Sequence, residues 1–160
     1  MLQDEDGSLW LGCKPGGLLH LSPRADGSYD ISRIALVIRG REKEHHVYSM
    51  QKDRWGRLWV STLNHGLFCF TRTGKSWRCQ PIVLSHDDKT GKYLGVRMIY
   101  ISHRDELLAG TTLGLFATKL TAANPASLRF IQHEREGGRD GRLPLTLTVK
   151  SCRNAWPSWL

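Results

Sequence analysis

Hydrophobic positions in the middle of the chain fall into three short runs that are separated by turn residues. The runs are Val47–Gln51, Leu58–Thr62 and Leu67–Phe70, and they contain many of the aromatic and β-branched residues that suit a pleated sheet. Between them stand Asp53–Gly56 and Asn64–Gly66, whose Asp, Asn and Gly residues favour tight turns. The pattern predicts a meander of three antiparallel strands, which needs neighbours to cover its faces.

The same pattern recurs with a period of 49 residues. Trp10 and Trp59 are separated by this distance, and so are the turn glycines Gly7 and Gly56. One further step of the same length reaches Leu108. The glycines that open the third strand of each copy are Gly17, Gly66 and Gly114. A repeat of this length with about four strands per unit is typical of a β-propeller.

The repeats divide the chain into three predicted blades and a tail. The predicted segments are blade 1 at 1–46 with a truncated innermost strand, blade 2 at 47–93, blade 3 at 94–133, and a final segment at 134–160. The final segment is expected to hold a linker, a first strand of a fourth blade at Leu145–Lys150 and an irregular tail. A chain that starts within one repeat and ends within another is expected to be a fragment, by truncation or by a frameshift.

The fourth, outer strand of each blade is predicted from a further hydrophobic run. These strands are Tyr29–Ile34, Ser76–Val83 and Leu128–Gln132, and the sequence leaves the form of Ala35–Ile38 open. The predicted fold is therefore all-β, a partial β-propeller of about three four-stranded antiparallel blades. It does not close, because propellers typically have four to eight blades. We expect such an open array to associate with further blades or with itself through its open edges.

The third copy is degenerate. Ser102 stands at the position of Asp53, Asp105 replaces the turn glycine, and Leu108 replaces the tryptophan. A large tryptophan in each of the other copies is expected to fill the gap between adjacent sheets. Trp10 and Trp59 are therefore interpreted as structural residues rather than as ligand-stacking ones.

The pattern D-x-x-G-x-L-W, followed later by G-L-hydrophobic, resembles the two-component regulator propeller repeat. It occurs at Asp4–Gly12 and again at Asp53–Thr62. Two positions depart from the family pattern, since Cys13 stands where the family has Thr and Ser61 where it has Gly. In that family the repeats form seven-bladed propellers in the periplasmic part of hybrid sensor histidine kinases, which often detect glycan fragments.

The resemblance implies a fragment of a ligand-sensing propeller that binds an oligosaccharide or transmits its binding. It also implies a periplasmic location as part of a full-length sensor, although Met1–Asp6 does not have the form of a signal peptide. The sequence contains no apolar run long enough for a membrane helix. It also shows none of the phospho-acceptor or ATP-binding motifs of a kinase.

The formal net charge of +8 does not by itself indicate a nucleic-acid partner. The Lys and Arg residues are scattered, and the densest group, Arg39–Glu44, alternates with acids. A solvated basic surface is therefore the preferred interpretation. The four cysteines, none of them in a metal-binding spacing, are Cys13, Cys69, Cys79 and Cys152. A disulfide between Cys69 and Cys79 remains open, and the redox compartment stays undecided.

Ligands of propellers usually meet the loops at one mouth of the central channel. The polar residues expected there are Lys14, His45, His46, Asn64, His65, His86, Asp87 and Asp88. Four of them are histidines, which leaves a metal site as an alternative, but no spacing fixes them together. No catalytic motif and no cofactor-binding motif occurs, so no catalysis by this chain is expected. Two other classes stay open, a propeller enzyme (a lyase or glycan hydrolase) and a protein-interaction scaffold.

Overall fold

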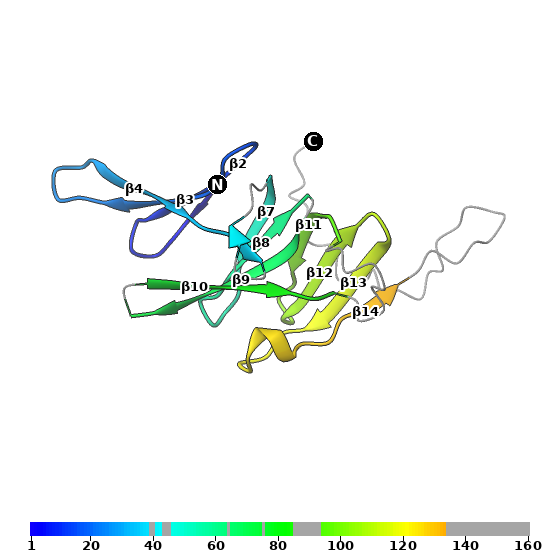
Figure 1. The fold of residues 1–160 in the computed structure, drawn as a ribbon. Helices are drawn as coiled ribbons and strands as arrows, with labels where there is room; N and C mark the ends of the chain where they lie inside the picture. The colour runs from blue at the N-terminus through cyan, green and yellow to red at the C-terminus, as the bar shows by residue number, and fades with distance from the viewer. Residues whose placement is uncertain (39–40, 43–45, 64, 75, 85–93, 134–160) are drawn as a thin grey trace, which may run out of the picture.

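The computed structural model describes residues 1–38, 41–42, 46–63, 65–74, 76–84 and 94–133. These residues form three four-stranded antiparallel sheets, which follow one another from left to right in Figure 1. We call them blade 1, blade 2 and blade 3. Blade 1 consists of β1 (Leu2–Gln3), β2 (Leu9–Cys13), β3 (Gly17–Pro23) and β4 (Tyr29–Ile34).

Blades 2 and 3 repeat the same order of strands, each paired with the next along the chain. Blade 2 consists of β7 (Val47–Lys52), β8 (Leu58–Thr62), β9 (Gly66–Thr73) and β10 (Ser76–Ile82). Blade 3 consists of β11 (Val96–Ile101), β12 (Glu106–Thr111), β13 (Gly114–Lys119) and β14 (Ile131–His133). The remaining elements are the short pair β5 (Val37–Ile38) and β6 (Arg41–Glu42) and the 3₁₀ helix η1 (Pro125–Ser127).

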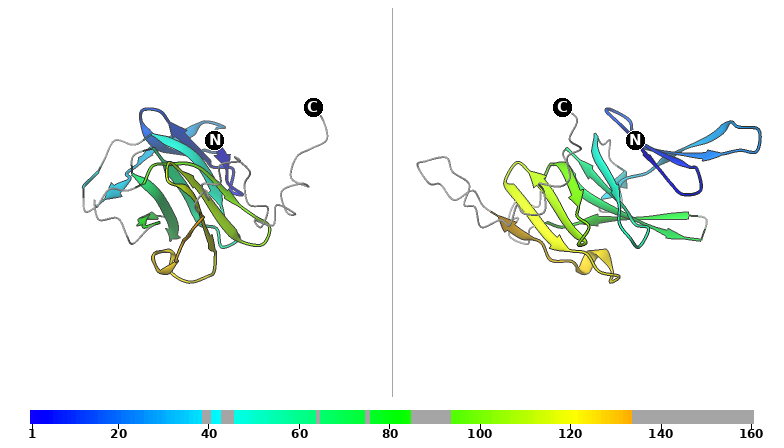
Figure 2. Two further views of the ribbon diagram at one scale, coloured as in Figure 1. Left: turned by 90° about the vertical axis from the view of Figure 1, so that its right-hand side faces the viewer. Right: turned by 180° about the vertical axis from the view of Figure 1, so that it is seen from behind.

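The predicted fold class is confirmed. All sheets in the described part of the chain are antiparallel, each blade has four strands, and the three blades do not close into a ring (Figure 2). No helix in this part has the length and the apolar character that a membrane crossing requires.

Blade 2 lies between two hydrophobic clusters because successive side chains of a strand point to opposite faces of the sheet. One cluster joins it to blade 1 and includes Trp10, Val60 and Phe68. The other joins it to blade 3 and includes Trp59 and Phe116. Both tryptophans are fully buried between adjacent sheets. Every residue of β8 is buried as well, as expected for a sheet that is covered on both faces.

Two glycines allow neighbouring blades to approach closely. A Cβ atom added to Gly12 would lie 2.4 Å from Val47 Cγ1, and one added to Gly95 would lie 2.0 Å from the carbonyl oxygen of Leu63. Real Cβ atoms do not approach other heavy atoms to such distances, so the contacts between blades require glycine at both positions.

The outer strand of blade 3 differs from the prediction, because β14 begins at Ile131 rather than at Leu128. Asn124 caps the 3₁₀ helix η1 by accepting a hydrogen bond from the backbone N–H of Ala126 at 3.1 Å. This turn delays the return of the chain to the sheet. The segment Ala35–Ile38, whose form the sequence left open, ends in the short strand β5. The predicted strand Leu145–Lys150 lies outside the described residues.

The open question of a disulfide is settled by strand register. Cys79 pairs with Phe70, whereas Cys69 pairs with Gln80. The two cysteines are thus one residue out of register, on opposite faces of blade 2, and both are free thiols. Burial raises the pKa of Cys69 to about 12 and also raises that of Cys79.

Candidate functional site

Each blade presents two ends. The mouth end holds the turns between the second and third strands and the connections between blades, and the base end holds the turns between the first and second strands. The predicted ligand residues belong to the mouth end. There, Lys14 lies on the turn between β2 and β3, and its Nζ atom is 3.5 Å from the centre of the Tyr48 ring of blade 2. This cation–π contact fixes a positive charge at the junction of two blades.

The mouth end is continuous from blade 1 to blade 3. The carbonyl oxygen of His46 accepts a hydrogen bond from the backbone N–H of Leu63 at 3.1 Å. Leu63 in turn contacts Gly95, which precedes the first strand of blade 3. His65 lies half-buried on the turn between β8 and β9. The structure thus places Lys14, His46 and His65 at the mouth end of adjoining turns and connections.

The other predicted ligand residues, His45, Asn64, His86, Asp87 and Asp88, lie outside the described residues. Two of them, His45 and His86, also belong to the alternative histidine metal site. Among the residues that the structure does describe, no three metal-ligating side chains gather in one place. The metal alternative therefore gains no support from this part of the chain.

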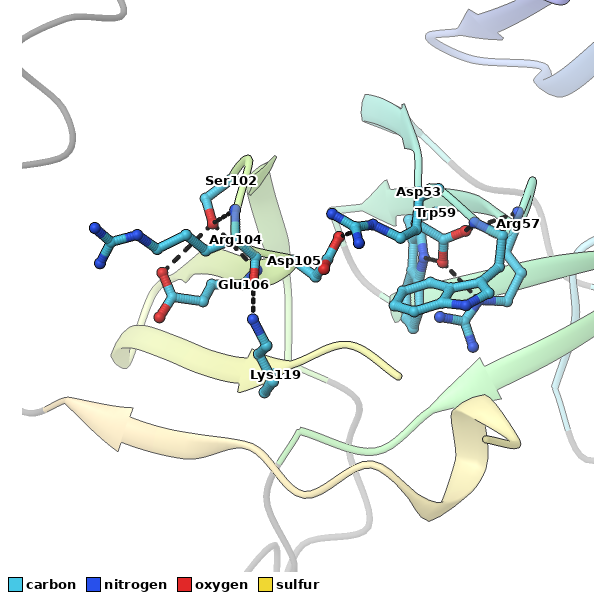
Figure 3. A network of polar contacts seen from close by, with 10 residues as sticks. Asp53, Arg57, Trp59, Ser102, Arg104, Asp105, Glu106 and Lys119 are labelled. Carbon is cyan, nitrogen blue, oxygen red and sulfur yellow. Dashed lines mark hydrogen bonds and ion pairs between the residues drawn. The ribbon is translucent and has the colours of Figure 1, made fainter. Parts of the chain in front are cut away.

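The base end of blade 2 contains a buried charged network around Asp53 (Figure 3). One carboxylate oxygen, Oδ1, accepts hydrogen bonds from the backbone N–H groups of Trp55 and Arg57, both at 3.0 Å. The other, Oδ2, accepts from Arg57 Nε at 2.5 Å and from Trp59 Nε1 at 2.9 Å. The Asp53 side chain has no exposed surface, so its carboxylate is fully desolvated in the ion pair with Arg57.

Blade 3 keeps the shape of this turn with different residues. Ser102 Oγ accepts hydrogen bonds from the backbone N–H groups of Arg104 and Glu106 at 3.2 and 3.1 Å, the same two roles as Asp53 Oδ1. The positions of Arg57 and Trp59 are taken by Glu106 and Leu108, which need no anionic partner. Asp105 has a left-handed backbone conformation with φ 59°. In the equivalent turns of blades 1 and 2, this conformation is adopted by Gly7 and Gly56.

Ion pairs connect the base ends of adjacent blades. Lys52 of blade 2 pairs with Asp4 of blade 1, and Arg54 Nε of blade 2 lies 2.7 Å from Asp105 Oδ1 of blade 3. Burial alone would raise the pKa of Asp4, but Lys52, the Glu5 backbone N–H and the Trp10 indole together hold it below its ordinary value. Trp10 Nε1 nevertheless makes no hydrogen bond of ordinary geometry, unlike Trp59. These pairs fix the rotation of one blade against the next.

A hollow of about 510 Å³ opens at the base end between blades 1 and 2. Its lining combines acids, bases and aromatic rings: Asp4, Glu5, Asp6, Lys52, Trp55, Gly56, Arg57, Thr71, Arg72, Trp77 and Ala122. Most of its charges are already paired, but Arg57 Nη2 is buried without a hydrogen-bond partner. The exposed ring of Trp55 lies 4.8 Å from the Arg57 guanidinium. This hollow is not apparent from the sequence, in which Asp53–Gly56 indicates only a turn.

A second hollow, of about 670 Å³, lies between the outer strands of blades 1 and 2. His20 and Trp77 are among its lining residues. Burial lowers the pKa of His20, so its imidazole is neutral at pH 7. The ring of His20 packs 4.3 Å from that of Trp10 in the same blade and 6.4 Å from that of Trp77 in blade 2, so His20 is part of the contact between the two blades.

Comparison with known proteins points to one family. A sequence model of the family described as two component regulator propeller matches residues 42–64. This segment contains β7, β8 and the turn with the buried Asp53, and the match confirms the resemblance that the repeat pattern carries. No curated protein matches the chain.

Proposed function

We propose that this chain is part of the ligand-sensing propeller of a two-component sensor, and that it binds an oligosaccharide at the mouth end of its blades. In this proposal the chain acts by binding and not by catalysis, and the sensor operates in the periplasm. The observation that supports the proposal is the family match over 42–64 within a stack of three propeller blades.

The geometry of the mouth end suits a carbohydrate. Lys14, His46 and His65 supply side-chain hydrogen-bond donors and acceptors, and they come from turns and connections that adjoin one another. Tyr48 holds the Lys14 ammonium group in a fixed position, so this donor is ordered before a ligand arrives. Polar groups of these kinds recognise sugar hydroxyls where they converge on a ligand.

The proposal is tested by isothermal titration calorimetry of the chain against a panel of neutral and uronate-containing oligosaccharides. For any oligosaccharide that binds, Lys14→Ala is expected to weaken affinity by roughly ten- to a hundredfold, since a hydrogen bond from a charged donor contributes roughly 1.5–3 kcal/mol. The matched control is Lys119→Ala, which removes an exposed lysine at the base end of blade 3.

Three outcomes would contradict the proposal. No binding across the panel would remove the sensing function for this chain. Equal effects of Lys14→Ala and Lys119→Ala would show that the mouth end is not the site. A loss of binding on Trp55→Ala alone would place the sugar in the base-end hollow, where an exposed indole is available for stacking.

A further inference from the structure

The base-end hollow between blades 1 and 2 contains a buried hydrogen-bond donor that lacks an acceptor. Arg57 lines this hollow, and its side chain is 6% exposed. Its Nε atom donates to Asp53 (Figure 3), and its Nη1 atom donates to the carbonyl oxygen of Ala123 at 3.0 Å. Its Nη2 atom has no hydrogen-bond partner among the described residues. Because buried polar groups are almost always paired, this atom indicates an acceptor that comes from outside the chain.

That acceptor does not have to be an anion, because the charge of Arg57 is already balanced. The other charges around the hollow are balanced in the same way, in three acid–base pairs: Asp4–Lys52, Asp6–Arg72 and Asp53–Arg57. The remaining charge of the lining is the exposed carboxylate of Glu5, which makes no ion pair within the described part of the chain. The hollow therefore has one uncompensated negative charge and favours a ligand with a positive group.

Two indole rings provide the apolar part of the hollow. Trp55 lies on the turn between β7 and β8 and is 38% exposed, and Trp77 of β10 is half-buried. Aromatic rings offer a large apolar area to a hydrocarbon group that packs on them. The volume of about 510 Å³ lies in the range of sites that hold small molecules. A fitting ligand is therefore small and has an apolar group.

Rotation of Trp55 gives a ligand access to the buried donor. The centre of the Trp55 ring lies 4.8 Å from the Arg57 guanidinium, while the Nη2 atom itself is buried. Rotation of an exposed side chain is common on binding, even where the backbone moves little. The contact that is lost in this movement is one cation–π interaction at the surface, which is weak.

We propose that this hollow binds the N-terminal residue of a peptide whose first side chain is apolar. The ammonium group pairs with Glu5, the first carbonyl oxygen accepts a hydrogen bond from Arg57 Nη2, and the side chain packs on the indole rings. An N-terminal residue holds these three groups around a single carbon atom, and capture of N-terminal amines is an established mode of peptide recognition. The site lies at the opposite end of the blades from the proposed sugar site.

The test is an NMR titration of the full, isotope-labelled chain with L-leucinamide, which has the ammonium group, the carbonyl oxygen and the apolar side chain. Saturable shifts are expected at the indole N–H of Trp55, identified by its absence in Trp55→Phe, and at the Nε–H of Arg57. Isopentylamine lacks only the amide group and is expected to bind roughly ten- to a hundredfold more weakly, because Arg57 Nη2 then stays unpaired. N-acetyl-L-leucinamide lacks the ammonium group and is expected to bind about threefold more weakly.

A variant of Glu5 isolates the contact with the ammonium group. Glu5→Gln is expected to weaken the binding of L-leucinamide about threefold and to leave that of N-acetyl-L-leucinamide unchanged, because the acetylated probe has no charge to pair with Glu5. The matched control is Glu106→Gln, which removes an exposed acid at the base end of blade 3, outside the hollow. It should change neither affinity. Both residues are exposed, so both variants are expected to fold, and far-UV circular dichroism checks this.

Four results would overturn the proposal. The first is the absence of saturable shifts, and the second is a set of shifts that excludes Trp55 and Arg57. The third is equal affinity for isopentylamine and L-leucinamide, which would show that Arg57 Nη2 does not bind the carbonyl oxygen. The fourth is an equal response to Glu5→Gln and Glu106→Gln. The titration uses no sugar, so its failure is distinct from a failure of the proposed function.

Discussion

The buried charge at the base of blade 2 allows a sharp test of how this repeat is held together. Asp53 is the only anionic partner that the structure gives to Arg57 among the described residues, and the Arg57 side chain is 6% exposed. Asp53→Ser keeps an oxygen for the two backbone N–H groups, as Ser102 does in blade 3. The substitution therefore isolates the loss of the charge from the loss of the turn.

We expect Asp53→Ser to lower the free energy of unfolding by about 3–5 kcal/mol, the typical cost of leaving one partner of a buried ion pair uncompensated. The double variant Asp53→Ser/Arg57→Leu removes both charges. The losses that remain are the unpaired indole N–H of Trp59, roughly 1–3 kcal/mol, and the hydrogen bond from Arg57 Nη1 to the carbonyl oxygen of Ala123, roughly 0.5–1.5 kcal/mol. The double variant is thus expected to be more stable than the single one by about 1 kcal/mol.

The measurement is unfolding in urea, followed by tryptophan fluorescence and by far-UV circular dichroism. The control is Asp26→Ser, because Asp26 accepts a similar turn hydrogen bond from Ser28 N at 2.9 Å but is exposed and holds no buried cation. Its urea midpoint should match that of the wild type. A double variant that is less stable than Asp53→Ser, or a cost of Asp53→Ser below about 1 kcal/mol, would refute the reasoning.

Three further predictions follow from single positions. Gly12→Ala is expected to lower the free energy of unfolding in urea by about 1–3 kcal/mol, because the added methyl group overpacks the contact with Val47. At the equivalent position of blade 3, a Cβ atom added to Gly110 would lie 3.7 Å from the carbonyl oxygen of Met98, so Gly110→Ala should change this free energy by less than about 0.5 kcal/mol. Cys69, whose pKa is raised to about 12, is expected to resist iodoacetamide at pH 8 in the folded chain and to react in urea, as peptide mass mapping would show. The lowered pKa of Asp4 means that its contact with Lys52 stabilises the chain above the ordinary pKa of 3.8 and stops doing so as the pH falls through the lowered value. The stability difference between wild type and Lys52→Gln should therefore shrink below about pH 4, and a difference that is constant with pH would contradict this.

The strand order and the contacts between blades were predictable because the period of 49 residues carries both. Trp10 and Trp59 are large, apolar and placed one period apart, so the burial of one implied the burial of the other. The turn glycines were predictable for a related reason, since Gly7 and Gly56 both adopt positive φ angles. Local pattern was sufficient wherever the structure is set by alternation within a strand and by turn chemistry.

The ion pairs and the hollow between blades could not be predicted from the sequence, because they depend on how one blade is rotated against the next. The pairs Lys52–Asp4 and Arg54–Asp105 join residues about one period apart, and no single repeat contains both partners. The hollow between blades 1 and 2 likewise arises only when blades are stacked, and so does the burial of Arg57 Nη2 without a hydrogen-bond partner. The spacing of Asp53, Arg57 and Trp59 does indicate the buried network. However, an aspartate at this position also suits an ordinary turn, so the sequence alone does not show that Asp53 binds both Arg57 and Trp59.

The third repeat replaces all three groups of this network, whereas blade 1 keeps the aspartate and the tryptophan as Asp4 and Trp10 and has Ser8 at the position of Arg57. Where the aspartate is lost to Ser102, the arginine and the tryptophan are replaced as well, by Glu106 and Leu108. A serine in place of Asp53 beside an unchanged arginine leaves a buried cation without a partner, which is the costly arrangement that Asp53→Ser tests. Loss of all three groups leaves only the two backbone N–H groups to satisfy, and one hydroxyl oxygen accepts from both. The turn of blade 3 is therefore a stable alternative to the turn of blade 2 rather than a damaged copy of it.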